Sequence, residues 1–179
     1  MNRPQPQKGP ASQRQRKSFK ELAQEWMREK KVEIRLKTAF GDDVGSAQEL
    51  VNLAREVGHE AFKQGLTTNQ IRNIFGIVKG WERDYLRFSG GQINQDPNPP
   101  RLRQELIMLN PKLVYAASRH DKQGTWLFVL TLQNALEEVL SKSNLREGFR
   151  RFVDFFEAIL AFHKEAEVES RKRQVEGGD

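Results

Sequence analysis

A basic stripe along one predicted helix is the feature of this chain that most clearly suggests chemistry. Between residues 66 and 87, a step of about 100° per residue gathers four cations on the side opposite the apolar residues. These cations are Arg72, Lys79, Arg83 and Arg87. Gly76 and Gly80 lie in the same stripe, and because a glycine inside a helix costs about 1 kcal/mol relative to alanine, they suggest that a ligand approaches the helix backbone closely. A sugar-phosphate strand would fit, whereas the alternative is a helix face that contacts only water.

Two further groups of basic residues support contacts with a polyanion. The first falls at spacings i, i+3, i+7 and i+10, which share one helix face, and comprises Lys112, Tyr115, Arg119 and Lys122. A tyrosine among cations can pack on a sugar or a base while its neighbours pair with phosphates. The second group opens the last predicted helix, where the helix dipole mildly disfavours cations, and comprises Arg146, Arg150 and Arg151.

Residues that usually carry catalysis show no suitable spacing in this chain. The three histidines, His59, His120 and His163, include no pair at the i, i+4 spacing of a helical zinc site, and no glycine-rich phosphate loop is present. The absence of cysteine excludes disulfides and thiolate metal sites. His163 lies on an apolar stripe, where a core histidine with a satisfied hydrogen bond is expected. We therefore expect no enzyme, no cofactor and no metal site.

Composition places any affinity for polyanions in the arrangement of charge. The 179 residues have a net charge of +6, but residues 1–17 hold five cations and no acid. The other 162 residues thus carry 25 of the 30 Lys and Arg side chains against all 24 acids. No apolar run approaches the roughly 20 residues of a membrane span, and the N-terminus lacks the apolar core of a secretory signal. We expect a cytoplasmic protein without membrane contact.

Helical periodicity predicts an all-α fold, a compact bundle of about five to six helices. Residues 1–17 are too polar to order themselves and are expected to form a disordered basic tail. Residues 18–179 are expected to form a single helical-bundle domain whose charged C-terminus frays from about residue 168. Capping boxes at Ser18 with Glu21 and at Thr67 with Gln70 mark two helix starts.

The remaining helices follow from the apolar spacing. One runs from about 46 to 63, the basic helix from 67 ends at Ser89–Gly91, and another begins near Leu102. Asn110–Pro111 is either a kink or a fresh start. Residues 32–36 alternate like a strand, but we favour a helix because no partner strand is present. Trp126–Leu130 is apolar on all sides and should be central.

The last helix, from about residue 145 to beyond residue 163, has an apolar stripe wider than one contact surface requires. Phe155 and Phe162 widen it. These two rings either bury against a second layer of the same chain or contact another copy of the protein. They are our predicted self-association residues.

Three segments, in this order, resemble the small subunit of type III-A CRISPR effector complexes, the Csm complexes. The segments are Leu66–Lys79, Leu109–Arg119 and Phe152–Lys164. The resemblance implies a small helical protein without catalysis, several copies of which stack along the guide RNA and target RNA duplex. It also implies partners in the backbone subunits and the large polymerase-like subunit. Four cations occupy the matching motifs and are implied to face RNA: Arg72, Lys79, Lys112 and Arg119.

Our main hypothesis is a non-catalytic RNA-binding subunit that contacts phosphates without reading sequence and associates with copies of itself. The residues predicted to bind RNA are Arg72, Lys79, Arg83, Lys112, Tyr115, Arg119, Lys122, Arg146 and Arg150. One alternative is a helix-turn-helix DNA-binding regulator, because a short Gly65–Leu66 junction precedes the basic helix. Another is a protein-only helical adaptor, suggested by the phenylalanines of the last helix. A metal-dependent nuclease is a distant third.

Overall fold

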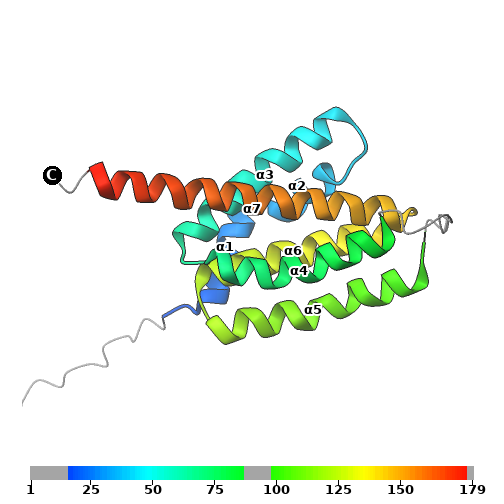
Figure 1. The fold of residues 1–179 in the computed structure, drawn as a ribbon, viewed down its shortest axis with the longest axis horizontal. Helices are drawn as coiled ribbons and strands as arrows, with labels where there is room; N and C mark the ends of the chain where they lie inside the picture. Colours follow the sequence, from blue (N-terminus) through cyan, green and yellow to red (C-terminus); the bar gives the residue numbers. More distant parts are fainter. Residues whose placement is uncertain (1–15, 87–97, 177–179) are drawn as a thin grey trace, which may run out of the picture.

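The computed structural model describes residues 16–86 and 98–176, which form seven α-helices and no strand (Figure 1). The all-α fold is therefore confirmed. The seventh helix arises because residues 32–39 form a helix of their own. The helices are α1 (Phe19–Glu29), α2 (Val32–Ala39), α3 (Val44–Lys63), α4 (Thr68–Tyr85), α5 (Pro100–His120), α6 (Gln123–Ser141) and α7 (Leu145–Glu176).

The two predicted capping boxes start helices as expected. At the start of α1, the backbone N–H of Ser18 donates to the Glu21 carboxylate at 2.7 Å, and the Glu21 N–H donates to the Ser18 hydroxyl at 3.2 Å. At the start of α4, the Thr67 N–H donates to Gln70 Oε1 at 2.9 Å. Each box satisfies backbone donors that the first turn of a helix leaves free.

Residues 32–36 are helical, which confirms the favoured interpretation. Val32 and Leu36 are buried four positions apart, whereas Ile34 between them is 64 % exposed. A strand would have placed all three on one face. The preceding Lys31 adopts a left-handed conformation with φ of 53°, which ends the first helix and starts the second in a new direction.

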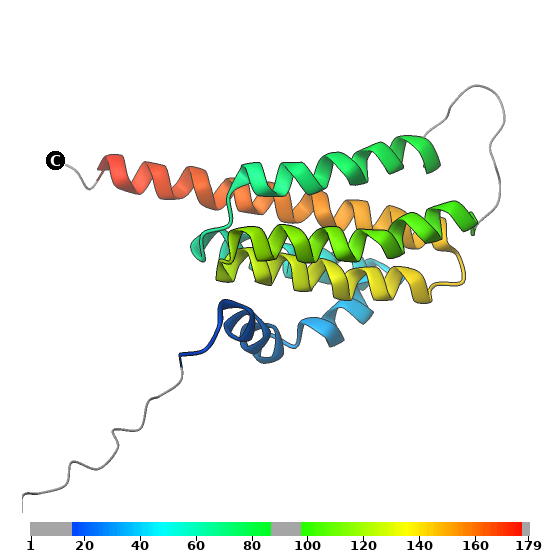
Figure 2. The same ribbon diagram turned by 90° about the horizontal axis from the view of Figure 1, so that it is seen from below.

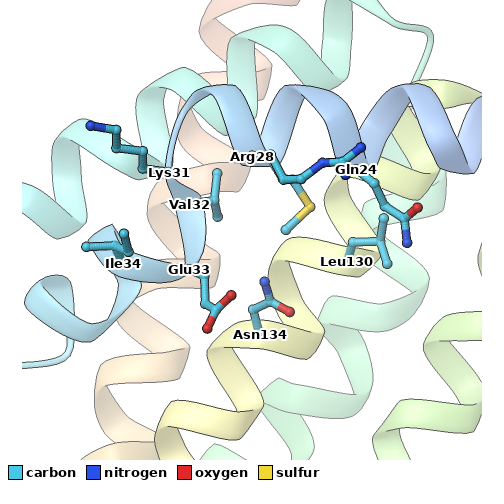
Figure 3. A pocket seen from close by; sticks show the side chains of 9 residues that line it. Gln24, Arg28, Lys31, Val32, Glu33, Ile34, Leu130 and Asn134 are labelled. Atoms are coloured by element: carbon cyan, nitrogen blue, oxygen red, sulfur yellow. The ribbon is translucent and has the colours of Figure 1, made fainter.

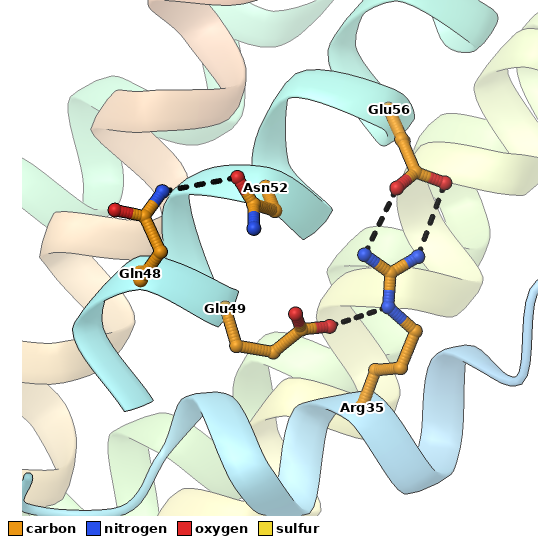
Figure 4. A network of polar contacts seen from close by, with 5 residues as sticks. All are labelled: Arg35, Gln48, Glu49, Asn52 and Glu56. Atoms are coloured by element: carbon orange, nitrogen blue, oxygen red, sulfur yellow. Dashed lines mark hydrogen bonds and ion pairs between the residues drawn. The ribbon is translucent and has the colours of Figure 1, made fainter. Parts of the chain in front are cut away.

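Arg35 ties α2 to α3 (Figure 4). Its guanidinium donates to both oxygens of Glu56, at 3.1 and 2.9 Å, and its Nε donates to Glu49. A guanidinium that binds two carboxylates in this forked way holds them in a fixed geometry. The short helix α2 is thereby held against a longer one.

Helix α6 is the centre of the bundle, as predicted. Leu127, Phe128 and Val129 are fully buried, and α6 contacts α1, α2, α3, α5 and α7 (Figure 2). Helix α7 packs along α3 and α4 and supplies a run of buried phenylalanines. The elements that carry the predicted basic surfaces, α4 and α5, therefore rest on a core made by α6 and α7.

Close packing of α7 on α3 depends on a glycine. A Cβ added at Gly58 would lie 2.8 Å from the Ile159 carbonyl oxygen and 2.9 Å from the His163 backbone nitrogen. Contacts this short between carbon and backbone atoms do not occur in relaxed structures. The two helix backbones thus approach as closely as they do because residue 58 has no side chain.

Several predicted boundaries shift or lie outside the described residues. Helix α5 continues through Pro111 as one helix, so the expectation of a fresh helix start at Asn110–Pro111 is wrong, and a kink there stays a prediction. Helix α4 ends at Tyr85, and the predicted end at 89–91 lies outside the described residues, as do residues 1–15 of the predicted tail. Helix α7 reaches Glu176, and fraying of its last turns stays a prediction. Among these seven helices, none combines the length and apolar character needed to cross a membrane.

Candidate nucleic-acid interface

Helices α4 and α5 lie next to each other (Figure 1). A groove of about 520 Å³ lies between them. Ile74 lines it from α4, Ala116 lines it from α5, and the fully buried Phe128 of α6 forms its floor. Beyond one end of the groove, Lys112 Nζ of α5 lies 5.8 Å from the centre of the Trp81 ring of α4. This cation–π contact bridges the two helices and fixes their spacing there.

Exposed cations line the groove along α5, and a further cation lies at the start of α6. Tyr115 is 68 % exposed and shares a face with Lys112 and Arg119, as the i, i+3, i+7 spacing predicts. Lys122 is also exposed, but its predicted place on the same helix face is wrong, because α5 ends at His120 and Lys122 lies at the N-cap position of α6. There it lies next to Gly65, at the turn between α3 and α4. Within the described part of the chain, Lys112, Arg119 and Lys122 form no ion pair.

The acid nearest to these cations forms no ion pair with them among the described residues. Asp121, the acid nearest in sequence, accepts a hydrogen bond from Trp126 Nε1 at 2.9 Å and so is tied to the first turn of α6. Among the described residues, no acidic side chain lines the groove itself. The face formed by α5 and the start of α6 therefore presents positive charge to any ligand that enters.

The cations of the predicted basic stripe on α4 differ in their ion pairs and in their exposure. Lys79 is only 29 % exposed, because its Nζ binds Glu157 of α7 at 2.7 Å and also pairs with Glu82. Hydrogen bonds to Glu157 and then Glu82 raise the Lys79 pKa. Arg83 is exposed and lies 3.2 Å from Asp84. Lys79 thus ties α4 to α7, and its predicted contact with RNA stays a prediction that would require those ion pairs to open.

Arg72 and the two glycines remain open. Arg72 is exposed and has no ion pair or side-chain hydrogen bond with another described residue. A Cβ added at Gly76 or Gly80 would meet nothing within 4 Å. Close approach of a ligand to this face stays a prediction, and Arg87 of the same stripe lies outside the described residues.

The carboxylate of Glu167 lies at the start of α4, the end of the helix that carries a partial positive charge. Glu167 accepts hydrogen bonds from the Thr68 hydroxyl and from Lys164 Nζ, both at 2.9 Å, and from Arg171. The bonds from Lys164 and then Thr68 lower the Glu167 pKa to about 2. The sequence prediction missed this cluster. Lys164 lies three positions before Glu167 and Arg171 lies four positions after it, and both are spacings of helical ion pairs.

The basic residues that open α7 do not form one surface. Arg146 donates to the backbone carbonyl of Tyr85 and so joins α7 to the end of α4. Arg151 donates in the same way to the carbonyl of Gly41. Arg150 is exposed, with a guanidinium nitrogen 3.6 Å from Glu147. Arg146 and Arg151 therefore stabilise the fold, and Arg150 is the most accessible member of the group.

The two predicted self-association rings lie in different environments. Phe155 is fully buried and packs edge-on against Phe40, with ring centres 6.0 Å apart. Of the two expectations, burial within the chain therefore holds for Phe155, whose ring has no surface left to contact another copy. Phe162 is half-buried beneath the Arg55 guanidinium, which lies 4.6 Å from its ring centre. Self-association through Phe162 stays a prediction.

His163 is a core residue, as its place on the apolar stripe predicts. Its Nε2–H donates to the Leu66 carbonyl at 2.9 Å, while Nδ1 has no described partner. Burial lowers the His163 pKa. Among the residues that the structure describes, no three His, Asp or Glu side chains converge in a way that could hold a metal ion.

A second hollow, of about 510 Å³, lies where α1 and α2 meet α6 (Figure 3). Its lining mixes cations such as Arg28 and Lys31 with the carboxylate of Glu33. Mixed charge of this kind does not favour a polyanion. The groove between α4 and α5 is therefore the better candidate.

Comparison with known proteins adds one finding. A family model described as Csm2 Type III-A matches residues 45–169, more than half of the chain. This segment includes α5 and the groove, and it covers the segments whose resemblance the sequence indicated. No curated protein and no solved structure matches the chain. The chain therefore belongs to the type III-A Csm2 family, the small subunits of Csm complexes.

Proposed function

We propose that this small subunit helps to hold guide RNA and target RNA in its complex through phosphate contacts that do not depend on sequence. In this role it catalyses no reaction. Several copies line the guide–target duplex, beside the backbone subunits and the large polymerase-like subunit. The proposal rests on one observation, the exposed cations that form no ion pair with a described residue: Lys112 and Arg119 beside Tyr115 on α5, and Lys122 at the start of α6.

The chemistry of this face suits a subunit that must accept any guide. Base edges carry the sequence information, whereas phosphates are the same at every position. In RNA-guided complexes base pairing selects the target, so the protein needs only to recognise the backbone. Lysine and arginine side chains on a rigid helix supply such contacts, and Tyr115 can pack against a ribose or a base.

Among the predicted contact residues, the structure supports some more than others. Lys112, Arg119 and Lys122 are exposed and form no ion pair with a described residue, and Arg72 is a further such cation near the start of α4. Lys79 already binds two carboxylates of its own chain. We therefore assign the principal contacts to the three cations on α5 and at the start of α6.

A triple substitution tests this assignment. In Lys112→Ala/Arg119→Ala/Lys122→Ala, the slope of log affinity for a guide–target RNA duplex against log salt should become shallower by roughly 2 to 3, because each lost phosphate contact removes about 0.7–0.9. The matched control removes three exposed cations that pair with acids on their own helices, namely Lys37, Arg101 and Arg173. The control should keep most of the wild-type slope.

Equal slopes in the two triple variants would contradict the assignment of these residues. A wild-type protein without RNA affinity at low salt would instead support the protein-only adaptor. The helix-turn-helix alternative predicts preference for one DNA sequence. Membership of the Csm2 family gives that alternative no support.

A further inference from the structure

The groove between α4 and α5 has more apolar surface than phosphate contacts require. Cations on an exposed helix face are enough to bind a phosphate backbone. Here the cations border a groove of about 520 Å³ whose floor is the fully buried Phe128. A ligand that fits both the apolar groove and the cations beside it has a flat or apolar part and an attached anion.

A buried hydroxyl lies in this groove. Thr125 lines the groove from α6, is only 2 % exposed, and its Oγ1 has no hydrogen-bond partner among the described residues. A buried polar group without a partner is costly and is rarely left so. A ligand that brings a polar edge to the groove would satisfy it.

Side-chain amides line the α4 wall. Gln70 uses its Oε1 to accept from the Thr67 N–H at 2.9 Å, so its NH₂ group remains able to donate. Asn73 is exposed beside the groove and forms no hydrogen bond to another side chain among the described residues. Amides pair readily with the polar edges of nucleobases.

We propose that this groove receives one unstacked base of the bound RNA. The proposal rests on the RNA-binding function above and specifies what occupies the site. The faces of the base pack against the partly exposed Ile77 and Ala116, its edge faces Thr125, and its phosphates pair with Lys112 and Arg119. Because a hydroxyl group rotates to donate or to accept, the groove tolerates any base.

A helix from another copy of the chain is the competing occupant, and the groove suits it less well. Apolar side chains of a docked helix would leave Thr125 Oγ1 without a partner. They would also bring no negative charge to Lys112 and Arg119, which border the groove without an acid among its lining residues. A nucleotide satisfies both requirements at once.

The test uses the full chain and a short RNA duplex that carries one bulged 2-aminopurine, compared with the same duplex without the bulge. Wild-type protein should bind the bulged duplex about tenfold more tightly, a gain typical of one stacked base. The 2-aminopurine fluorescence should change on binding. Filling the groove with Ala116→Phe, or removing the hydroxyl with Thr125→Val, should abolish or reduce this preference while leaving affinity for the unbulged duplex unchanged.

Each variant has a matched control. Thr131 is a second buried threonine of α6 whose Oγ1 also lacks a described partner, but it does not line the groove. Val114 lies on α5 away from the groove. Thr131→Val and Val114→Phe should therefore keep the wild-type preference. Thermal melting shows whether each variant folds. If Ala116→Phe does not fold, the comparison of Thr125→Val with Thr131→Val still tests the proposal.

The outcomes separate this inference from the proposed function. Equal wild-type affinity for both duplexes, with unchanged fluorescence, would overturn base docking and leave phosphate binding intact. No affinity for either duplex would overturn both. If Ala116→Phe changed the sedimentation of the free protein but kept the preference for the bulge, the groove would be a contact between copies and the inference would be wrong.

Discussion

Two glycines inside helices should respond in opposite ways to replacement by alanine. Alanine is favoured over glycine in a helix interior by about 1 kcal/mol. At Gly76 a Cβ meets nothing within 4 Å, so this preference acts alone and Gly76→Ala should raise the free energy of unfolding by about 1 kcal/mol. At Gly58 the same preference is opposed by contacts with α7.

The contacts at Gly58 set the expected size of the effect. The added Cβ would lie 2.8 Å from the Ile159 oxygen, 2.9 Å from the His163 nitrogen and 3.1 Å from Phe162 Cβ. Two of these are backbone atoms, so α3 and α7 must move apart. Overpacking of this kind costs up to about 3 kcal/mol, and after subtracting the helix preference, Gly58→Ala should lose about 2 kcal/mol of stability.

Thermal unfolding followed by circular dichroism measures both changes. For a chain of this length 1 kcal/mol corresponds to about 2–4 °C in Tm. Gly58→Ala should therefore melt about 4–8 °C below wild type, and Gly76→Ala about 2–4 °C above it. If Gly58→Ala melted at or above the wild-type temperature, the close approach of α3 and α7 would be wrong.

Two further changes in stability follow from the backbone and from burial. Lys31→Gly should stabilise the protein by about 0.5–1 kcal/mol in urea unfolding, because glycine adopts the left-handed conformation without strain, whereas Lys30→Gly, at an ordinary φ of −81°, should not. The free energy of unfolding should fall as pH decreases through about 6.5, because burial lowers the His163 pKa below that value and the unfolded chain then binds the extra proton. The urea midpoint at pH 5.5 should lie below that at pH 7.5, with a smaller difference in His163→Gln; an unchanged midpoint would contradict this.

Features set by neighbouring residues in the sequence could be predicted. The capping boxes at Ser18 and Thr67 depend only on residues three positions apart. The burial of α6 follows from its uniformly apolar composition, and the place of His163 follows from the stripe on which it lies. The shared face of Lys112, Tyr115 and Arg119 follows from helical spacing alone.

Features that depend on distant segments could not be predicted. The helical wheel places Lys79 among the exposed cations, but α7 brings Glu157, 78 positions later in the sequence, into contact with it. The groove combines residues from α4, α5 and α6, and no single periodicity relates them. The Lys31 break between α1 and α2 is equally hidden, since a lysine gives no local signal for a left-handed conformation.

The order in which the helices are synthesised has a consequence for folding in the cell. Helix α7 comes last and spans 32 residues, yet it supplies core side chains for α3, α4 and α6. Until it leaves the ribosome, the nascent chain exposes apolar faces that have no partner, which is the condition under which chains aggregate. We therefore expect a chain truncated before Leu145 to aggregate or to be degraded instead of accumulating as folded protein.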